Sequence, residues 1–372
     1  MGDKSTSGPP ISSRVASIDA LRGFDMMWIC GADEVIHSLC SLIHHPVANA
    51  LNTQFEHVDW VGFHFYDLIF PLFLFIVGVV LPFSITKRLE AGADRGDIYK
   101  HLVRRLFLLF FLGLIYNGLL KFQFHELRIP GVLQRIAICY FITALVMMKT
   151  GVRGQAVVAG SLLVVYWAVI KLVPVPGIGA GIITPAGNLS AFIDQHLIPR
   201  PFCCYVFGDN EGILSTIPAI STCLMGALAG HWLRSDRPQV RKALGLVIAG
   251  VASLVLGLTW GHWFPVIKNI WTSSFVLVAG GWSLLLLALF YWIIDIRGWR
   301  RWAFFFTVIG LNSITIYVLR SQFDFGTVAN IFLQGFVNHI GCYRPLVWDT
   351  SVLAVEWLFL WFLYRQKIFL KV

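Results

Sequence analysis

Side chains able to handle a proton gather in one short stretch of this 372-residue chain. The segment EHVDWVGFHFYD contains His57 and Asp59 and ends at Asp67, where a long apolar run begins. An imidazole has an ordinary pKa of about 6.5 and can exchange its proton near neutral pH, so the histidines of this stretch have two interpretations: neutral replacements for lysine, or part of a site that uses imidazole. Asp67 has two interpretations that the sequence leaves open: a helix cap, or a carboxylate that orients an imidazole.

Other charged residues lie inside apolar segments, where a charge is costly and usually has a function. Asp19, Arg22 and Asp25 follow one another at intervals of three residues and share a helix face, either as a local ion pair or as part of a site. Arg135 needs an anionic partner, and we expect this to be Glu356 or a ligand phosphate.

The elements that carry these residues are membrane helices. Apolar residues make up 57% of the chain and charged residues 13%, a composition that one water-facing globule cannot accommodate. The apolar runs are continuous and close to the ~20 residues that a transmembrane helix needs, which excludes a β-barrel. We predict an all-α, polytopic membrane protein with ten transmembrane helices, over residues 18–42, 66–86, 101–119, 131–149, 155–173, 212–233, 241–262, 272–294, 302–320 and 346–365.

The distribution of basic residues predicts the orientation. With both termini in the cytoplasm, 20 of the 29 Lys and Arg residues face the cytoplasm and seven face outward. Residues 1–17 then form a polar cytoplasmic tail, and 18–372 form a single domain with external loops at 43–65 and 174–211. Residues 324–337 are too short to span and are left open as a re-entrant or interfacial segment.

Several function classes are excluded or disfavoured. The net charge of +9 reflects the cytoplasmic loops, so we expect a lipid bilayer and no nucleic acid as partner. The seven cysteines show no CxxC spacing, so no metal site is expected, and the redox state of Cys203 and Cys204 is left open. No Gly-rich phosphate loop, HExxH motif or serine nucleophile elbow is present. Two classes remain: a transporter and a membrane-embedded transferase.

Eight segments spread over most of the chain resemble the heparan-α-glucosaminide N-acetyltransferase family of transmembrane acetyltransferases, including its bacterial NagX-type members. These segments are IDALRG (18–23), FEHVDWVGF (55–63), YDLIFPLFLFIVG (66–78), RIPGVLQR (128–135), DNEGILSTI (209–217), FPVIKNIW (264–271), GLNS (310–313) and LYRQKIF (363–369). The animal members have an asparagine after the first helix and a histidine after the GLNS block. This chain lacks both, which bears on the acceptor sugar more than on the donor.

The resemblance implies a chemistry. Acetyl-CoA from the cytoplasm donates its acetyl group to the amine of a terminal or free glucosamine-type sugar at the outer, periplasmic side of a bacterial inner membrane. The family's H-x-x-W-x-G pattern places the catalytic histidine at His57, as general base or as acetyl carrier. The alternative function is an amino-sugar or small-glycan permease, and a homodimer is one assembly left open.

The remaining site residues are assigned by role. We assign to catalysis, beside His57, the orienting carboxylate Asp67 and the oxyanion donors Asn269 and Asn312. We assign to the donor acetyl-CoA a set of side chains able to bind phosphate: Arg22, Arg105, Arg128, Gln134, Arg135 and Arg297. We assign to the acceptor sugar Asp59, Trp60, Asp209, Glu211 and Ser313.

Overall fold

The computed structural model describes residues 15–370, so most of the predicted N-terminal tail lies outside the described residues. The longer helices are α1 (Ala16–Met27), α2 (Asp33–Ser41), α3 (Pro46–Gln54), α4 (Ile69–Leu81), α6 (Arg95–Tyr116), α7 (Val132–Lys149), α8 (Val152–Leu172), α9 (Leu189–Leu197), α10 (Thr216–Arg234), α11 (Gln239–Gly261), α12 (Ser273–Phe290), α13 (Ala303–Leu311), α14 (Ser313–Gln322), α15 (Phe325–Val337) and α16 (Arg344–Arg365). The four-residue helix α5 is Lys87–Glu90, and short helical turns cover Trp28–Ala32, Phe65–Leu68, Pro82–Thr86, Leu119–Lys121, Tyr291–Ile296 and Gly341–Tyr343. Two antiparallel hairpins pair β1 (Pro174–Val175) with β2 (Gly179–Ala180), and β3 (Cys204–Tyr205) with β4 (Gly208–Asp209).

Each of the ten predicted ranges contains a helix, but the count of ten membrane spans is not confirmed. Among the described residues, six helices are long and apolar enough to cross a membrane, and α13 with α14 would make a seventh if this pair, bent by 67°, is one span. The first predicted range is divided by a π-helical turn in which Gly31 has a φ of 90°. The segment 324–337, which the sequence left open, contains the 13-residue helix α15, and α15 packs against α16.

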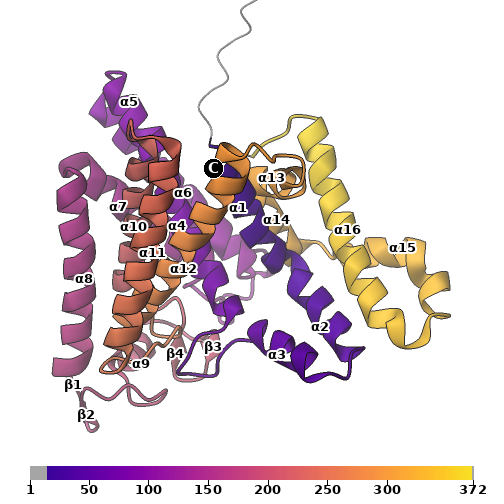
Figure 1. The fold of residues 1–372 in the computed structure, drawn as a ribbon. Coiled ribbons are helices and arrows are strands. Elements are labelled where there is room, and N and C mark those ends of the chain that lie inside the picture. The colour runs from indigo at the N-terminus through magenta and orange to yellow at the C-terminus, as the bar shows by residue number, and fades with distance from the viewer. Residues whose placement is uncertain (1–14, 371–372) are drawn as a thin grey trace, which may run out of the picture.

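The helices surround α4, the most enclosed of the candidate spans. In the most apolar 18-residue stretch of the span Phe65–Glu90, which contains α4, 72% of the residues are buried inside the protein. The corresponding share is 28% in α8 and in α11, which therefore present most of their surface to the surroundings. Helix α10 packs against α4, α7, α8 and α12, and α1 packs against α4, α12 and α13. In Figure 1, α15 and the lower part of α16 project from one side of this bundle.

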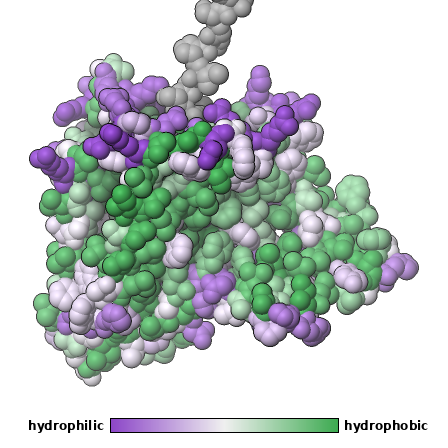
Figure 2. All heavy atoms as spheres, viewed as in Figure 1, coloured by the Kyte–Doolittle hydropathy of each residue, from purple (hydrophilic) through white to green (hydrophobic). Residues whose placement is uncertain are grey.

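One edge of the molecule is polar, and the middle of the face shown in Figure 2 is apolar. Hydrophobic residues cover the middle of the face shown in Figure 2, and hydrophilic residues gather along its upper edge, on the side of α5. The C-terminal end of α16 and the start of α1 both lie on this upper side in Figure 1. The predicted loops 43–65 and 174–211, which contain α3, α9 and both hairpins, lie on the opposite side.

Small residues allow α4 and α10 to approach until their backbones touch. A Cβ atom added to Gly226 would lie 2.0 Å from the carbonyl oxygen of Phe75, and one added to Gly78 would lie 1.9 Å from that of Cys223. Gly226 and Gly230 form the GxxxG pair of α10, a pattern that permits close helix packing in membranes. A backbone carbonyl cannot move aside as a flexible side chain can, so this contact fixes the position of α4.

We expect Gly226→Val to destabilise the protein by at least the ~1–3 kcal/mol that is typical of overpacked cores. The added side chain would separate α10 from α4 at the centre of the bundle. The matched control is Gly160→Val on α8, where an added Cβ meets no atom within 4 Å. Thermal unfolding of the detergent-purified variants measures the difference, and equal melting temperatures for the two variants would contradict the packing described here.

Candidate active site

His57, Asp67 and Lys268 lie together at the side opposite α5. The Nδ1 atom of His57 lies 2.9 Å from Oδ1 of Asp67. The Nζ atom of Lys268 lies 2.9 Å from Nδ1 and 3.2 Å from Nε2 of the same ring, and 3.2 Å from Oδ1 of Asp67. The Asp67 carboxylate is 1% exposed, whereas the His57 ring is 53% exposed, so the imidazole is the member of this cluster that a ligand can reach most easily.

Asp67 makes contacts of both kinds that the sequence left open. It lies in the helical turn Phe65–Leu68, and its Oδ2 atom accepts the backbone N–H of His64 at 3.1 Å, as a helix-capping residue does. Its Oδ1 atom faces His57. If Nδ1–H of the imidazole donates to Asp67, Nε2 is the ring nitrogen that can accept a proton, from Lys268 at 3.2 Å or from a ligand.

A cavity of about 300 Å³ adjoins this cluster. Its polar lining includes His57, Lys268, Asn210 and Glu211, together with the hydroxyl-bearing residues Tyr66, Tyr116 and Tyr317, and Cys204. The rest of the lining is apolar and comes from α1, the helical turn Trp28–Ala32, α4, α7 and α14: Met26, Ile29, Ile69, Phe70, Phe73, Val132, Leu133, Ile136 and Ile314. A proton acceptor therefore lies at the wall of a largely apolar cavity, as in many small-molecule sites.

Sequence reasoning missed several of these lining residues. Lys268 was counted only as an external positive charge, although it stands beside Asn269 in a segment that resembles the family. Tyr66 precedes Asp67 directly, and its ring lies against the His57 ring with centroids 4.8 Å apart. The position of both residues next to assigned ones was a signal that could have found them.

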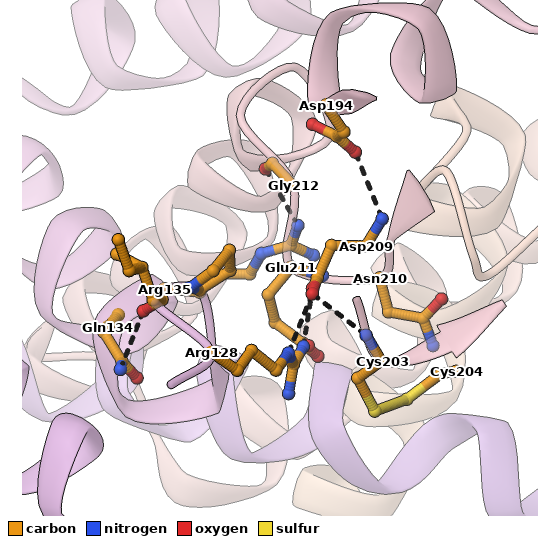
Figure 3. A network of polar contacts seen from close by, with 12 residues as sticks. Arg128, Gln134, Arg135, Asp194, Cys203, Cys204, Asp209, Asn210, Glu211 and Gly212 are labelled. Carbon is orange, nitrogen blue, oxygen red and sulfur yellow. Dashed lines mark hydrogen bonds and ion pairs between the residues drawn. A yellow bond between two sulfur atoms is a disulfide. The ribbon is translucent and has the colours of Figure 1, made fainter. Parts of the chain in front are cut away.

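Arg128, Asp209 and Glu211 form one ion-pair cluster, although the sequence assigned Arg128 to the donor and the two carboxylates to the acceptor (Figure 3). Nε of Arg128 donates to Oδ2 of Asp209 at 2.7 Å, and its NH2 group contacts Oδ1 of Asp209 at 2.5 Å and the carboxylate of Glu211. Asp209 is fully buried and also accepts the backbone N–H of Cys203 at 3.1 Å. Much of the charge of all three side chains is thus satisfied within the protein.

The predicted pairing of Arg135 with Glu356 is wrong. Arg135 is 1% exposed, and its guanidinium donates to the carbonyl of Gly212 at 3.3 Å and to the hydroxyl of Ser215 (Figure 3). It also lies over the Trp271 ring, 4.9 Å from the centroid.

Glu356 and Gln134 have partners other than Arg135. Glu356 pairs with Arg320 at 3.0 Å. Gln134, which directly precedes Arg135 in the sequence, donates from its side-chain amide to the carbonyl of Ile129 at 3.0 Å.

Three arginines assigned to CoA phosphates lie apart from the His57 cavity. Arg22 donates to Asp19 at 2.9 Å and to the carbonyl of Gly310 at 2.7 Å, which bears out the local ion-pair interpretation, while Asp25 is fully buried in α1. Arg105 lies over the Tyr140 ring and Arg297 over the Trp292 ring. A second cavity of about 540 Å³ on the α5 side is lined by Arg22 but by neither of the other two; its charged lining is Asp19, Arg22, Lys87, Glu90 and Arg234.

Five further assigned residues do not line the His57 cavity. Asn312 is buried between α13 and α14, where its side chain donates to the carbonyl of Ile368 at 3.0 Å and accepts from the Leu370 N–H at 3.3 Å. Trp60 donates to the carbonyl of Ile183 at 2.9 Å, which joins the two predicted external loops. Asp59 is exposed, Asn269 is half-buried in the turn after Lys268, and Ser313 is buried at the start of α14. Their predicted roles stay predictions.

Cys203 and Cys204, whose redox state the sequence left open, form a disulfide. Cys204 lines the His57 cavity and pairs with Asp209 across the β3–β4 hairpin, so this bond lies between the cavity and the ion-pair cluster (Figure 3). Within residues 15–370, no group of three His, Cys, Asp or Glu side chains is placed to hold a metal ion.

Comparisons with known proteins support the resemblance found in the sequence. A family model described as a domain of unknown function, DUF5009, matches residues 14–172. The heparan-alpha-glucosaminide N-acetyltransferases of Homo sapiens and Mus musculus are each 27% identical to this chain over 86% of its length. The match covers 56% of each relative, so the chain spans about half the length of these curated relatives.

Proposed function

We propose that this chain, which is related to the heparan-α-glucosaminide N-acetyltransferase family, transfers an acetyl group across a membrane. The donor is acetyl-CoA at the cytoplasmic side, where α5 lies. The acceptor is the amine of a terminal or free glucosamine-type sugar at the outer side, where His57 lies. The membrane is the inner membrane of a bacterium, and both chain termini face the cytoplasm, as the Lys and Arg distribution predicts.

The observation that carries this proposal is a pair of cavities on the same faces of α1 and α4. On α1 and the helical turn that follows it, Ile18 and Arg22 line the cavity on the α5 side, while Met26 and Ile29 line the His57 cavity. These positions are three or four residues apart and therefore lie along one face of the helix. A donor whose nucleotide is held at one end can thus extend along this face toward His57.

Helix α4 and the turn that follows it show the same relation. Val80 and Phe83 line the cavity on the α5 side, and Phe73 and Phe70 line the other. The lining of the His57 cavity is largely apolar, which suits an uncharged pantetheine arm. The basic residues Arg22, Lys87 and Arg234 at the α5 end suit the CoA phosphates.

The chemistry at His57 follows from its contacts. The sugar amine attacks the thioester carbon and loses a proton to Nε2 of His57, while Asp67 holds the imidazole through Nδ1. The carbon–nitrogen bond forms, the carbon–sulfur bond breaks, and the proton passes to the departing sulfur. A variant of this route transfers the acetyl group to His57 first.

Inverted membrane vesicles test both the reaction and its direction. These vesicles expose the cytoplasmic face, so we expect labelled acetyl-CoA added outside to acetylate glucosamine trapped inside. Vesicles without the protein are the control. Acetyl-CoA trapped inside, with glucosamine on the same side, should give no product. Absence of protein-dependent product across several amino sugars and pH values would count against an acetyltransferase.

The same pair of cavities would suit a path for an amino sugar or small glycan, which is the alternative function. Proteoliposomes distinguish the two. A permease takes up labelled N-acetylglucosamine without acetyl-CoA, whereas an acetyltransferase leaves the label outside and binds CoA.

A further inference from the structure

We propose that Lys268 is a third catalytic residue of this site and that its ammonium stabilises the negative charge that develops on the thioester oxygen. This inference rests on the proposed acetyl transfer and deepens it. It moves the oxyanion role from Asn269 and Asn312, neither of which lines the His57 cavity, to a residue that does.

The position of Lys268 is fixed by the turn that connects α11 with α12. Within this turn Ile267 and Thr272 are joined by three contacts: the Thr272 N–H donates to the Ile267 carbonyl at 3.1 Å, the Thr272 hydroxyl contacts the same carbonyl at 3.5 Å, and the Ile267 N–H donates to that hydroxyl at 3.0 Å. The N–H of Gly62 donates to the Val266 carbonyl at 2.9 Å, which ties the turn to the loop that carries His57. The backbone of Lys268 is therefore held beside the imidazole by the hydrogen bonds of this turn.

The cavity offers no other cation for this role. Among the described residues that line it, Lys268 is the single Lys or Arg. The nearby Glu211 already has a partner in Arg128, and Lys268 faces Asp67, with Nζ and Oδ1 3.2 Å apart. Preorganised positive charge in a site of low polarity stabilises a developing oxyanion far better than it would in water.

Lys268 also lies within reach of the reacting atoms. For His57 to accept its proton, the attacking nitrogen must lie about 3 Å from Nε2. In the tetrahedral intermediate the oxyanion is two bonds away from that nitrogen. Nζ of Lys268 lies 3.2 Å from the same Nε2 atom, so the ammonium and the oxyanion occupy neighbouring positions.

Burial gives Lys268 a titration behaviour that an experiment can detect. The Lys268 side chain is 15% exposed, and its desolvation lowers its pKa below the usual value, although the charge of Asp67 opposes this shift. The groups that face the ammonium are His57, Asp67 and, farther away, Glu211. The ammonium therefore loses its charge at a lower pH than an exposed lysine would, and the alkaline loss of activity should report this event.

Three substitutions test the proposal in the purified, detergent-solubilised protein. We expect Lys268→Met to lower kcat by about 10²–10³-fold, the usual cost of one oxyanion donor. The KM for acetyl-CoA should change little. We expect Lys268→Arg to retain more activity and to move the alkaline loss of activity to higher pH, because a guanidinium stays charged. Lys121→Met is the control, since this lysine is exposed and does not line the cavity.

Three experimental results would contradict the proposed role of Lys268 in stabilising the oxyanion. Retention of kcat within threefold in Lys268→Met would exclude Lys268 from catalysis. A parallel fall of kcat, CoA binding and melting temperature would make it a structural residue. If the Lys268→Arg variant is active but loses its activity at the same alkaline pH as the wild type, this result would also contradict the proposal. Wild-type activity in the same assay separates the two proposals, because an inactive wild-type protein overturns acetyl transfer itself.

Discussion

Replacing His57 with alanine is expected to lower kcat for acetyl transfer by about 10²–10⁴-fold, the usual contribution of general acid–base catalysis. His57 is the imidazole at the cavity wall, and Asp67 holds its Nδ1 atom at 2.9 Å. The donor should still bind with nearly unchanged affinity, because a general base acts on the transition state. Steady-state rates of amino-sugar acetylation, together with CoA binding by calorimetry, measure both quantities.

Two further variants sharpen this result. His44→Ala is the control, because His44 is an exposed residue of the same predicted external loop and does not line the cavity. Asp67→Asn should lower kcat less than His57→Ala does, since it disturbs the orientation of the imidazole without removing it. Loss of activity in His44→Ala but not in His57→Ala would show that the catalytic residue is assigned wrongly, even with acetyl transfer established.

Arg128→Met is expected to reduce the free energy of unfolding by about 3–5 kcal/mol, because it leaves buried carboxylates without their cation. Asp209 is fully buried, and both it and Glu211 contact the Arg128 guanidinium. Glu211 lines the His57 cavity, so acceptor turnover should fall along with stability. Arg128→Lys should recover part of the stability, since an ammonium supplies the charge but not the two-pronged geometry.

Thermal and denaturant unfolding in detergent measure this effect. The matched control is Lys100→Met, which removes an ion pair with Asp97 whose side chains are 83% and 74% exposed. Exposed ion pairs contribute little, so the control should unfold close to wild type. An Arg128→Met protein as stable as Lys100→Met would mean that the Asp209 and Glu211 carboxylates are satisfied in some other way.

The membrane character and the His57–Asp67 pair could be predicted from the sequence because both depend on local information. A long apolar run reports its own solvent preference without any knowledge of its neighbours. His57 and Asp67 are ten residues apart, at the junction of a loop and a helix, where a carboxylate caps the helix and reaches back to the loop. The GxxxG spacing of Gly226 and Gly230 likewise favours close helix packing, but that the partner is α4 follows from the fold alone.

The partners of the other charged groups were decided only by the tertiary structure. Lys268 is 211 residues from His57, and Arg128 is 81 residues from Asp209, so no local pattern could join them. Arg135 and Glu356 were paired because both are ionisable residues in apolar segments, but α7 turns Arg135 toward Gly212 while Glu356 meets Arg320. Hydropathy determines that a charge inside the bundle needs a partner. Which partner it finds depends on how the helices are rotated and packed against one another, and this is a property of the assembled fold.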